Sequence, residues 1–208
     1  MMPIRVLTVD DHPILREGIA AIIENHADIV LVGEAGNGRE AIECFRKLHP
    51  DVTLMDLVMP EMNGIVATIA IRKEFPNARI VVLTTYKGDV QAAQALDAGA
   101  YGYLLKSTLR KDLVDTIRGV HAGQKRIPPE IALAMAAHHS SDTLSERELE
   151  VLQQVAAGNA NKIVAANLSI SEDTVKGHVK AILAKLGAND RTHAVTIALK
   201  RGIISLEE

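Results

Sequence analysis

Five polar residues that could act together stand directly after, or at the end of, short apolar segments of the chain. In sequence order they are Asp10, Asp11, Asp56, Thr84 and Lys106. Carboxylates that lie close together repel one another unless a cation neutralises them. Because the set offers hard oxygen ligands and no soft donor, Mg²⁺ is the expected cation, with Mn²⁺ as a second choice. Magnesium in proteins commonly joins one or two carboxylates to a phosphate, so the set indicates phosphoryl chemistry.

Asp56 is the best candidate for a nucleophile in this set. A carboxylate held at the end of a strand can attack a phosphoryl group and form an aspartyl phosphate. The metal ion, the Lys106 ammonium and the Thr84 hydroxyl would stabilise the charge that spreads over the phosphoryl oxygens. The segment before Asp56 is expected to be a central strand, and the Met59-Pro60 turn would hold the residue in place.

The first 120 residues supply a scaffold that can bring these side chains together. Short segments rich in β-branched residues predict strands, and stretches with helical periodicity lie between them. The expected strands are 4–9, 29–33, 52–55, 80–83 and 101–105, and the main helical stretches are 14–23, 41–48, 65–72, 90–98 and 109–120. This alternation predicts an α/β fold, a doubly wound parallel sheet covered on both faces. Ligands bind such sheets beyond the carboxyl ends of the strands, where the polar residues fall.

Four separated runs, VDDHPILREG, LMDLVMPEMNG, VVLTTY and GAYGYLLKS, together resemble the receiver domain of two-component response regulators. The resemblance covers residues 1–121 and implies a flavodoxin-like, five-stranded fold. It implies that Asp56 is the phosphoacceptor and that a sensor histidine kinase is the donor. The metal ligands that it implies are Asp10, Asp11, Asp56 and the Val58 backbone carbonyl. Thr84 and Lys106 would be the signalling pair, with Tyr103 at the aromatic switch position.

Three neighbouring residues also have plainer interpretations. Tyr103 could be an ordinary aromatic residue on an edge strand. His12 could be a metal ligand, although a loop or N-cap position before the following helix is more typical. Cys44, the only cysteine, excludes an intrachain disulfide and a cysteine zinc site, and it lies on the apolar side of a helical pattern, so we expect a buried thiol.

The sequence changes character after residue 121. Residues 122–142 are predicted to be a linker with a short helix over 130–137 and a Ser/Asp-rich tether, and residues 143–208 a small all-α domain. Ser145 and Glu148 fit a capping box that opens its first helix, and a second helix covers 161–168. Ser171 caps a third helix that Gly187 ends. A fourth runs from Asn189 or Asp190 to about Arg201.

The second and third of these helices, joined by a short turn, form a helix-turn-helix pattern. Residues 174–206 contain six basic residues and one acid, although the whole chain has a net charge of −3. A local positive charge favours binding to a polyanion such as DNA. A solvated helix face, or a four-helix module that binds a protein, is the alternative.

The runs LSERELEVL, GNANKIVAANLSIS, DTVKGHVKAILAKLGANDRTHAV and RGI resemble the C-terminal helix-turn-helix of the LuxR/NarL (NarL/FixJ) class of regulators. The resemblance implies that the third helix is the recognition helix on double-stranded DNA. Lys176, Gly177 and Lys180 would reach base edges, and Thr174, His178 and Lys185 would lie at phosphates or in packing. The fourth helix would support self-association as a homodimer through Val195 and Leu199.

Three residues depart from the pattern of that class. Ala160 and Ile163 replace the usual Ser and Glu that would cap the second helix, which should cost about 1 kcal/mol unless Asn159 or Asn161 caps instead. Gly177 lies inside the recognition helix, where glycine costs roughly 1 kcal/mol relative to alanine. We expect these changes to affect DNA affinity and target sequence while leaving the fold intact.

The combined pattern predicts a response regulator that regulates transcription and is not an enzyme. One alternative is a regulator or adaptor that does not depend on phosphorylation. A Mg²⁺-dependent aspartyl phosphatase is disfavoured because Asp10-Asp11-His12-Pro13 lacks that class's DxD arrangement. No segment approaches the roughly 20 apolar residues of a membrane helix, and the N-terminus lacks the plan of a signal peptide. We therefore expect a cytoplasmic protein with no membrane partner.

Overall fold

The structure is a computed structural model that describes residues 2–85, 89–129, 131–133, 144–201 and 203–204. The chain forms two compact units, one of residues 1–85 and 92–129 and the other of residues 86–91 and 130–208. The first unit thus continues eight residues beyond the predicted receiver boundary at residue 121. The predicted helix over 130–137 and the tether after it lie mostly outside the described residues, and the linker boundaries stay a prediction.

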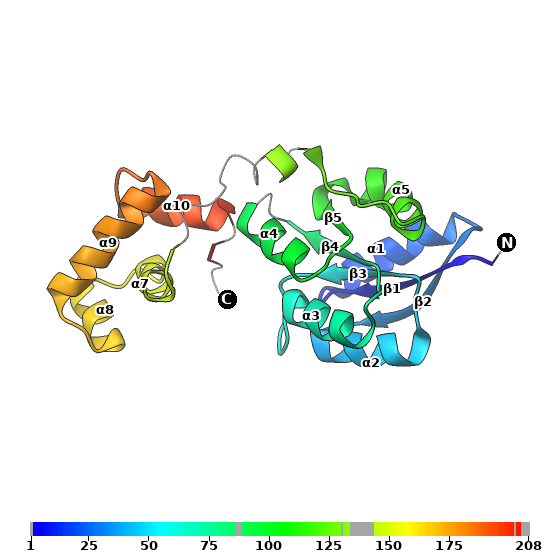
Figure 1. The fold of residues 1–208 in the computed structure, drawn as a ribbon, viewed down its shortest axis with the longest axis horizontal. Coiled ribbons are helices and arrows are strands. Elements are labelled where there is room, and N and C mark those ends of the chain that lie inside the picture. Colours follow the sequence, from blue (N-terminus) through cyan, green and yellow to red (C-terminus); the bar gives the residue numbers. More distant parts are fainter. Residues whose placement is uncertain (1, 86–88, 130, 134–143, 202, 205–208) are drawn as a thin grey trace. The chain divides into compact units, whose positions relative to one another are not determined.

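The first unit contains a five-stranded parallel sheet in the order β2-β1-β3-β4-β5 (Figure 1). Its strands are β1 (Ile4–Val9), β2 (Ile29–Ala35), β3 (Val52–Asp56), β4 (Ile80–Thr84) and β5 (Gly102–Leu105). The strand order reverses between β1 and β3, which is where such sheets bind ligands. The predicted fold is confirmed. Strands β2, β3 and β4 each end one or two residues later than predicted, because ladder pairing continues into the polar ends, as at Asp56 beside Leu83.

Helices cover both faces of this sheet (Figure 1). They are α1 (Pro13–Glu24), α2 (Gly38–Leu48), α3 (Gly64–Glu74), α4 (Asp89–Asp97) and α5 (Leu109–His121), and a short 3₁₀ helix, η1 (Lys106–Thr108), follows β5. Alternate strand residues point to opposite faces. Val6 and Leu54 therefore pack with α1 and α5, whereas Leu7 and Met55 pack with α2 and α3. Asp56, two residues after Leu54, continues the α1/α5 face beyond the end of the core.

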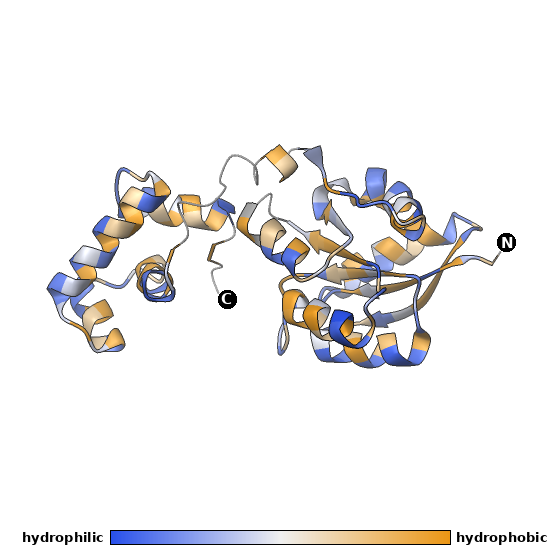
Figure 2. Ribbon diagram, viewed as in Figure 1, coloured by the Kyte–Doolittle hydropathy of each residue, from blue (hydrophilic) through white to orange (hydrophobic). Residues whose placement is uncertain are grey.

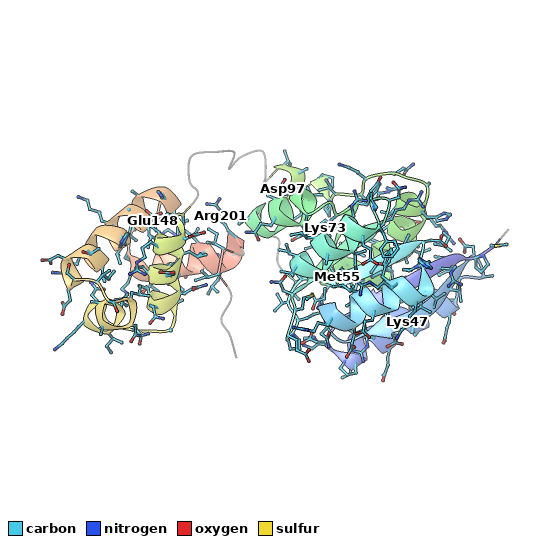
Figure 3. The ribbon with its side chains drawn as sticks, turned by 60° about the horizontal axis from the view of Figure 1, so that its bottom comes forward. Lys47, Met55, Lys73, Asp97, Glu148 and Arg201 are labelled. Carbon is cyan, nitrogen blue, oxygen red and sulfur yellow. The ribbon has the colours of Figure 1, made fainter. Side chains whose placement is uncertain are left out.

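Apolar residues gather on the strands and on the inner sides of the helices (Figure 2). Met55 lies inside the first unit, whereas Lys47 and Lys73 lie at its surface (Figure 3). This distribution agrees with the near-continuous apolar character of the strands, because strands buried on both faces need no polar side.

Four helices of the second unit match the expected pattern. They are α7 (Glu146–Ala156), α8 (Asn161–Leu168), α9 (Glu172–Leu186) and α10 (Arg191–Arg201). The capping box of Ser145 and Glu148 is present, and the Ser171 side chain accepts a hydrogen bond from the Thr174 backbone N–H. Gly187 ends α9 in the left-handed conformation, with φ of 61°. These helices share a core that includes Val151, Val164, Val175, Ile182 and Ala198.

The start of α8 lacks a side-chain cap among the described residues. Ala160 occupies the N-cap position, and the Asn159 amide donates to the Gln154 side chain instead, at 2.9 Å. The possibility that Asn159 compensates for the missing serine is therefore not realised. We expect α8 to be held mainly by the packing of Val164 and Ala165, which are buried.

None of the helices in the described part of the chain combines the length and apolar character that a membrane crossing requires.

Candidate functional sites

Lys106 joins two of the predicted carboxylates in a buried cluster at the carboxyl edge of the sheet. Its Nζ lies 2.7 Å from Asp10 Oδ2 and 2.9 Å from Asp56 Oδ2. Asp10 follows β1, Asp56 ends β3 and Lys106 follows β5, so the lysine side chain spans β4 to reach both acids. Asp10 and Asp56 are 0% and 3% exposed. Three residues that are far apart in the sequence thus meet where the strand order reverses.

Asp11 and His12 complete a group of possible metal ligands around these acids. One ligand atom from each of Asp10, Asp11, His12 and Asp56 lies within 4.8 Å of the others. His12 is the N-cap residue of α1, as expected, but its ring does not cap the helix. Instead His12 Nδ1 lies 2.8 Å from Asp11 Oδ1 and 3.2 Å from Asp10 Oδ1.

The charges of this cluster fit a divalent cation. Three carboxylates face one ammonium, so with neutral His12 the cluster carries two negative charges in excess. Its donors are hard oxygens and one imidazole, and none is a thiolate, which suits Mg²⁺ or Mn²⁺. Asp10, Asp11 and Asp56 would hold such an ion, and the positive charge of the ion would oppose their mutual repulsion.

Burial raises the pKa of Asp56 to about 6, and the negative charge of Asp10 adds to this effect. The hydrogen bond and charge of Lys106 oppose the rise but do not cancel it. Burial lowers the pKa of Lys106, but its hydrogen bonds to Asp10 and Asp56 outweigh that effect and raise the value. Lys106 is therefore a fixed cation, whereas Asp56 titrates close to neutrality without further positive charge.

The backbone around Asp56 is fixed by a close approach of α3. The Gly64 N–H donates to the Leu57 carbonyl at 3.0 Å. A Cβ on Gly64 would stand only 1.9 Å from the Asp56 carbonyl oxygen, so only glycine fits there. Asn63 caps α3 by accepting from the Val66 N–H at 2.9 Å. Val58 lies in the same loop with an exposed side chain. The function of Gly64 was not predicted, although it ends the LMDLVMPEMNG run.

Thr84 and Tyr103 lie in the adjacent strands β4 and β5, two residues apart in register, because Tyr103 pairs with Val82 and Thr84 pairs with Leu105. Both are 2% exposed. Burial raises the pKa of Tyr103 to about 12, against the opposing effect of its hydrogen bond with the Thr84 side chain. Tyr103 is thus an interior residue and not an exposed edge aromatic, even though β5 is the last strand of the sheet. Its hydrogen bond with Thr84 connects the carboxyl edge of the sheet, where Asp56 lies, to β5, the last strand.

Arg126 pairs with the outer edge of β5. The Tyr103 N–H donates to the Arg126 carbonyl at 2.7 Å, and the Arg126 N–H donates to the Tyr101 carbonyl at 3.0 Å. The Arg126 side chain lies over Gly119, where a Cβ would come within 2.3 Å of Nε. Sequence reasoning missed this contact because a single bridge has no periodic pattern.

The predicted DNA-contacting residues of α9 are divided between solvent and the domain interior. Thr174, Lys176, Gly177 and Lys180 are exposed, whereas His178 and Lys185 are partly buried. Val175, on the opposite side, is fully buried. The exposed residues form one side of the helix, as a surface that contacts DNA requires.

Lys185 joins α9 to α7. Its Nζ lies 2.7 Å from Glu148 Oε2, and Glu148 is only 6% exposed. The Ser145 N–H also donates to this carboxylate at 2.7 Å. Burial raises the pKa of Glu148, but the hydrogen bonds from Lys185 and Ser145 bring it below its usual value. Glu148 lies on α7 (Figure 3). This pair was not predicted, and it ties the Lys185 ammonium to the domain interior.

Val195 and Leu199 on α10 are partly buried and pack against the core of their own unit. Ala194 and Ala198, which precede them, are fully enclosed. The assignment of Val195 and Leu199 to self-association stays a prediction.

Comparisons with known proteins match two separate parts of the chain. Residues 6–118 match the response regulator receiver domain, and residues 142–198 match the luxR family of bacterial regulatory proteins. Response regulator protein VraR of Staphylococcus aureus is 39% identical over 208 residues, which is 98% of this chain and 100% of VraR.

Two solved structures support the relation. The response regulator ChrA of a heme-sensing two-component system is 36% identical with a TM-score of 0.59, over 98% of this chain and 100% of ChrA. RcsB of Salmonella enterica serovar Typhimurium, bound to a promoter in the presence of a phosphomimetic, is 28% identical with a TM-score of 0.71, over 96% of this chain and 98% of RcsB.

The match over residues 6–118, together with the parallel sheet and the contact of Lys106 with Asp56, assigns the first unit to the receiver domains of response regulators. The chain belongs to the response regulators that carry a LuxR-type helix-turn-helix domain, which are transcription regulators and not enzymes.

Proposed function

We propose that Asp56 accepts a phosphoryl group from a sensor histidine kinase and that this modification controls the binding of α9 to DNA. Asp10, Asp11, Asp56 and the Val58 carbonyl would hold Mg²⁺ or Mn²⁺. The observation that carries the proposal is the buried contact of Lys106 Nζ with both Asp10 and Asp56, beside a third carboxylate.

In the proposed transfer, an Asp56 carboxylate oxygen attacks the phosphorus atom of a phosphohistidine. The new P–O bond forms as the P–N bond to the donor imidazole breaks, and the donor imidazole takes up a proton. Lys106 lies close enough to Asp56 to stabilise the charge on the phosphoryl oxygens. A bound Mg²⁺ would supply further positive charge at this site and would favour the ionised form of the acids.

Thr84 is the proposed link between the phosphoryl group and the outer strands. Thr84 is the last residue of β4, which lies next to β3, and its side chain is hydrogen-bonded with Tyr103. A phosphoryl group on Asp56 offers strong acceptor oxygens. The Thr84 hydroxyl would turn toward them, and Tyr103 would lose or change its partner. Because both residues are buried, such a change requires repacking of β4 against β5.

The proposed DNA surface uses the exposed side of α9. Lys176, Gly177 and Lys180 would meet base edges in the major groove, and Thr174 and His178 would meet phosphates. Lys185 remains in the proposed set, although it is paired with Glu148. Two RcsB dimers have been solved on two parallel DNAs, which supports a homodimer as the binding form. Val195 and Leu199 are the proposed contacts between the copies.

The test compares wild type with Asp56→Asn in the full chain, with Mg²⁺ and with or without beryllofluoride, by light scattering and by duplex-binding anisotropy. We expect beryllofluoride to drive dimerisation and raise DNA affinity in wild type only. Asp115→Asn, which changes an exposed acid on α5, is the matched control and should behave as wild type. An equal response of Asp56→Asn and wild type would contradict the proposal. Affinity should also fall steeply with salt, since phosphate contacts release counterions.

A further inference from the structure

One exposed side of α9 begins with an acid. Asp173, Lys176, Gly177 and Lys180 follow the helical spacing of three, four and seven residues, so they share one face. All four are exposed, whereas Val175 is buried on the opposite face. Asp173 was absent from the predicted DNA contacts, but its position on the helix is equivalent to theirs.

Asp173 is fully available to a ligand except for one local contact. Its side chain is 89% exposed, and its Oδ1 lies 2.9 Å from Lys176 Nζ. The hydrogen bond from Lys176 lowers the pKa of Asp173, so the group is a carboxylate at neutral pH. A carboxylate on the proposed DNA-facing side would be repelled by phosphates, and a hydrogen-bond donor on a base edge would offset that repulsion.

A helix N-terminus favours acids, which is the plain explanation for Asp173. Glu172 already supplies a negative charge in the same first turn, however, and it lies about 100° around the helix, away from the centre of the exposed side. The helix dipole therefore explains why the first turn of α9 contains an acid, but it does not explain why an acid lies on the exposed side with Lys176 and Lys180.

Base-edge chemistry gives Asp173 a specific partner. In the major groove a carboxylate accepts from the N4 amino group of cytosine, and lysine donates to O6 or N7 of guanine. Gly177 has no described atom within 4 Å of its missing Cβ, so the helix surface beside Lys176 is open to close approach. The exposed side of α9 thus presents one acceptor, Asp173, and two donors, Lys176 and Lys180, around the open surface at Gly177.

We propose that Asp173 is a specificity-determining residue whose carboxylate accepts a hydrogen bond from a cytosine, while Lys176 donates to a nearby guanine. This inference rests on the proposed role of α9 as the recognition helix. Binding would exchange the contact between Asp173 and Lys176 for contacts with bases. A single good base contact changes discrimination by roughly fivefold to a hundredfold.

The test selects bound duplexes from a random pool with the full chain in Mg²⁺ and beryllofluoride. Wild type should enrich a motif with a cytosine that becomes degenerate in Asp173→Ala. In Asp173→Asn the same position should change to adenine, because an amide pairs with N6 and N7 of adenine. Glu172→Gln, the matched control, removes an equal charge from the same turn and should retain the cytosine.

Two results would overturn the inference. If Asp173→Ala binds all duplexes more tightly by one common factor and enriches the wild-type motif, Asp173 is a repulsive charge and reads no base. The proposed function then stands, because wild type still binds. If wild type enriches no duplex with beryllofluoride, the proposed DNA control fails and the assignment of Asp173 fails with it.

Discussion

The pocket around Asp56 and the exposed side of α9 both depend on charged side chains, but in opposite environments. In the pocket, Lys106 is 14% exposed and is shared by two buried carboxylates. On α9, Lys176 is 61% exposed and contacts one acid three residues away. A buried pair is hard to break because an unpaired charge remains behind. An exposed pair contributes little to stability, because solvent screens it, and it exchanges readily for another partner.

This difference fits the two proposed tasks of the protein. The pocket would hold several groups in fixed positions around one small phosphoryl group, and burial fixes these groups. The proposed DNA surface would release its internal contacts when DNA binds, and exposure permits this. The glycines of the two regions differ in the same way, since Gly64 has no room for a methyl group and Gly177 has open space.

The largest expected effect is that of Gly64→Ala. The new methyl group would overlap the Asp56 carbonyl, so α3 or β3 must move, at a cost of about 3 kcal/mol or more. Urea denaturation measures the loss, and phosphorylation by a small-molecule donor should fall with it. Gly18→Ala in α1 is the control, because its Cβ meets no described atom within 4 Å. If both variants are equally stable, the contact at Gly64 does not fix the pocket.

The next largest effect is the gain in stability expected for Asp56→Asn in the absence of metal ions, which comes from removing the charge of Asp56. Its pKa is about 6 in the folded chain, against 3.8 for an ordinary aspartate, so the fold favours the protonated form. The resulting stabilisation is complete below pH 3.8 and is lost as pH rises through about 6. We therefore expect Asp56→Asn, which stays neutral, to be more stable than wild type at pH 7.5 by up to about 3 kcal/mol.

Urea denaturation in chelator at several pH values tests this expectation. The stabilities of Asp56→Asn and wild type should differ progressively more as pH rises from 4 to 7, and Mg²⁺ should reduce the difference by stabilising wild type. Asp115→Asn provides the reference for an exposed acid. Parallel pH profiles for wild type and Asp56→Asn would mean that burial does not shift the titration of Asp56.

The smallest expected effect is that of Gly177→Ala in α9. Alanine lowers the backbone entropy lost on folding and meets no described atom, so the second unit should gain about 0.5 to 1 kcal/mol. Thermal unfolding measures the gain. A stability unchanged or lower than wild type would show that the site is less open than the structure indicates. DNA affinity measured in parallel separates the effect of Gly177→Ala on helix stability from its effect on how closely α9 can approach the bases.

The sequence predicted that Asp10, Asp56 and Lys106 would meet, because the physical causes of that meeting are local patterns. Strand and helix periodicity placed Asp10, Asp56 and Lys106 at strand ends, and parallel topology brings strand ends together. The sequence failed where a contact depends on packing between elements without a repeat. The pairing of Lys185 with Glu148 and the interior position of Tyr103 are examples. The missing cap of α8 shows that a suitable residue nearby, Asn159, can bond elsewhere.

Arg126 covers part of the outer edge of β5, the last strand of the sheet. Edge strands expose unpaired N–H and carbonyl groups that can join another chain. Here Arg126 occupies the Tyr103 N–H and the Tyr101 carbonyl. We expect a receiver fragment cut at residue 121 to lose that cover and to aggregate more readily through β5. A fragment that continues to Pro129 would keep these two backbone groups paired.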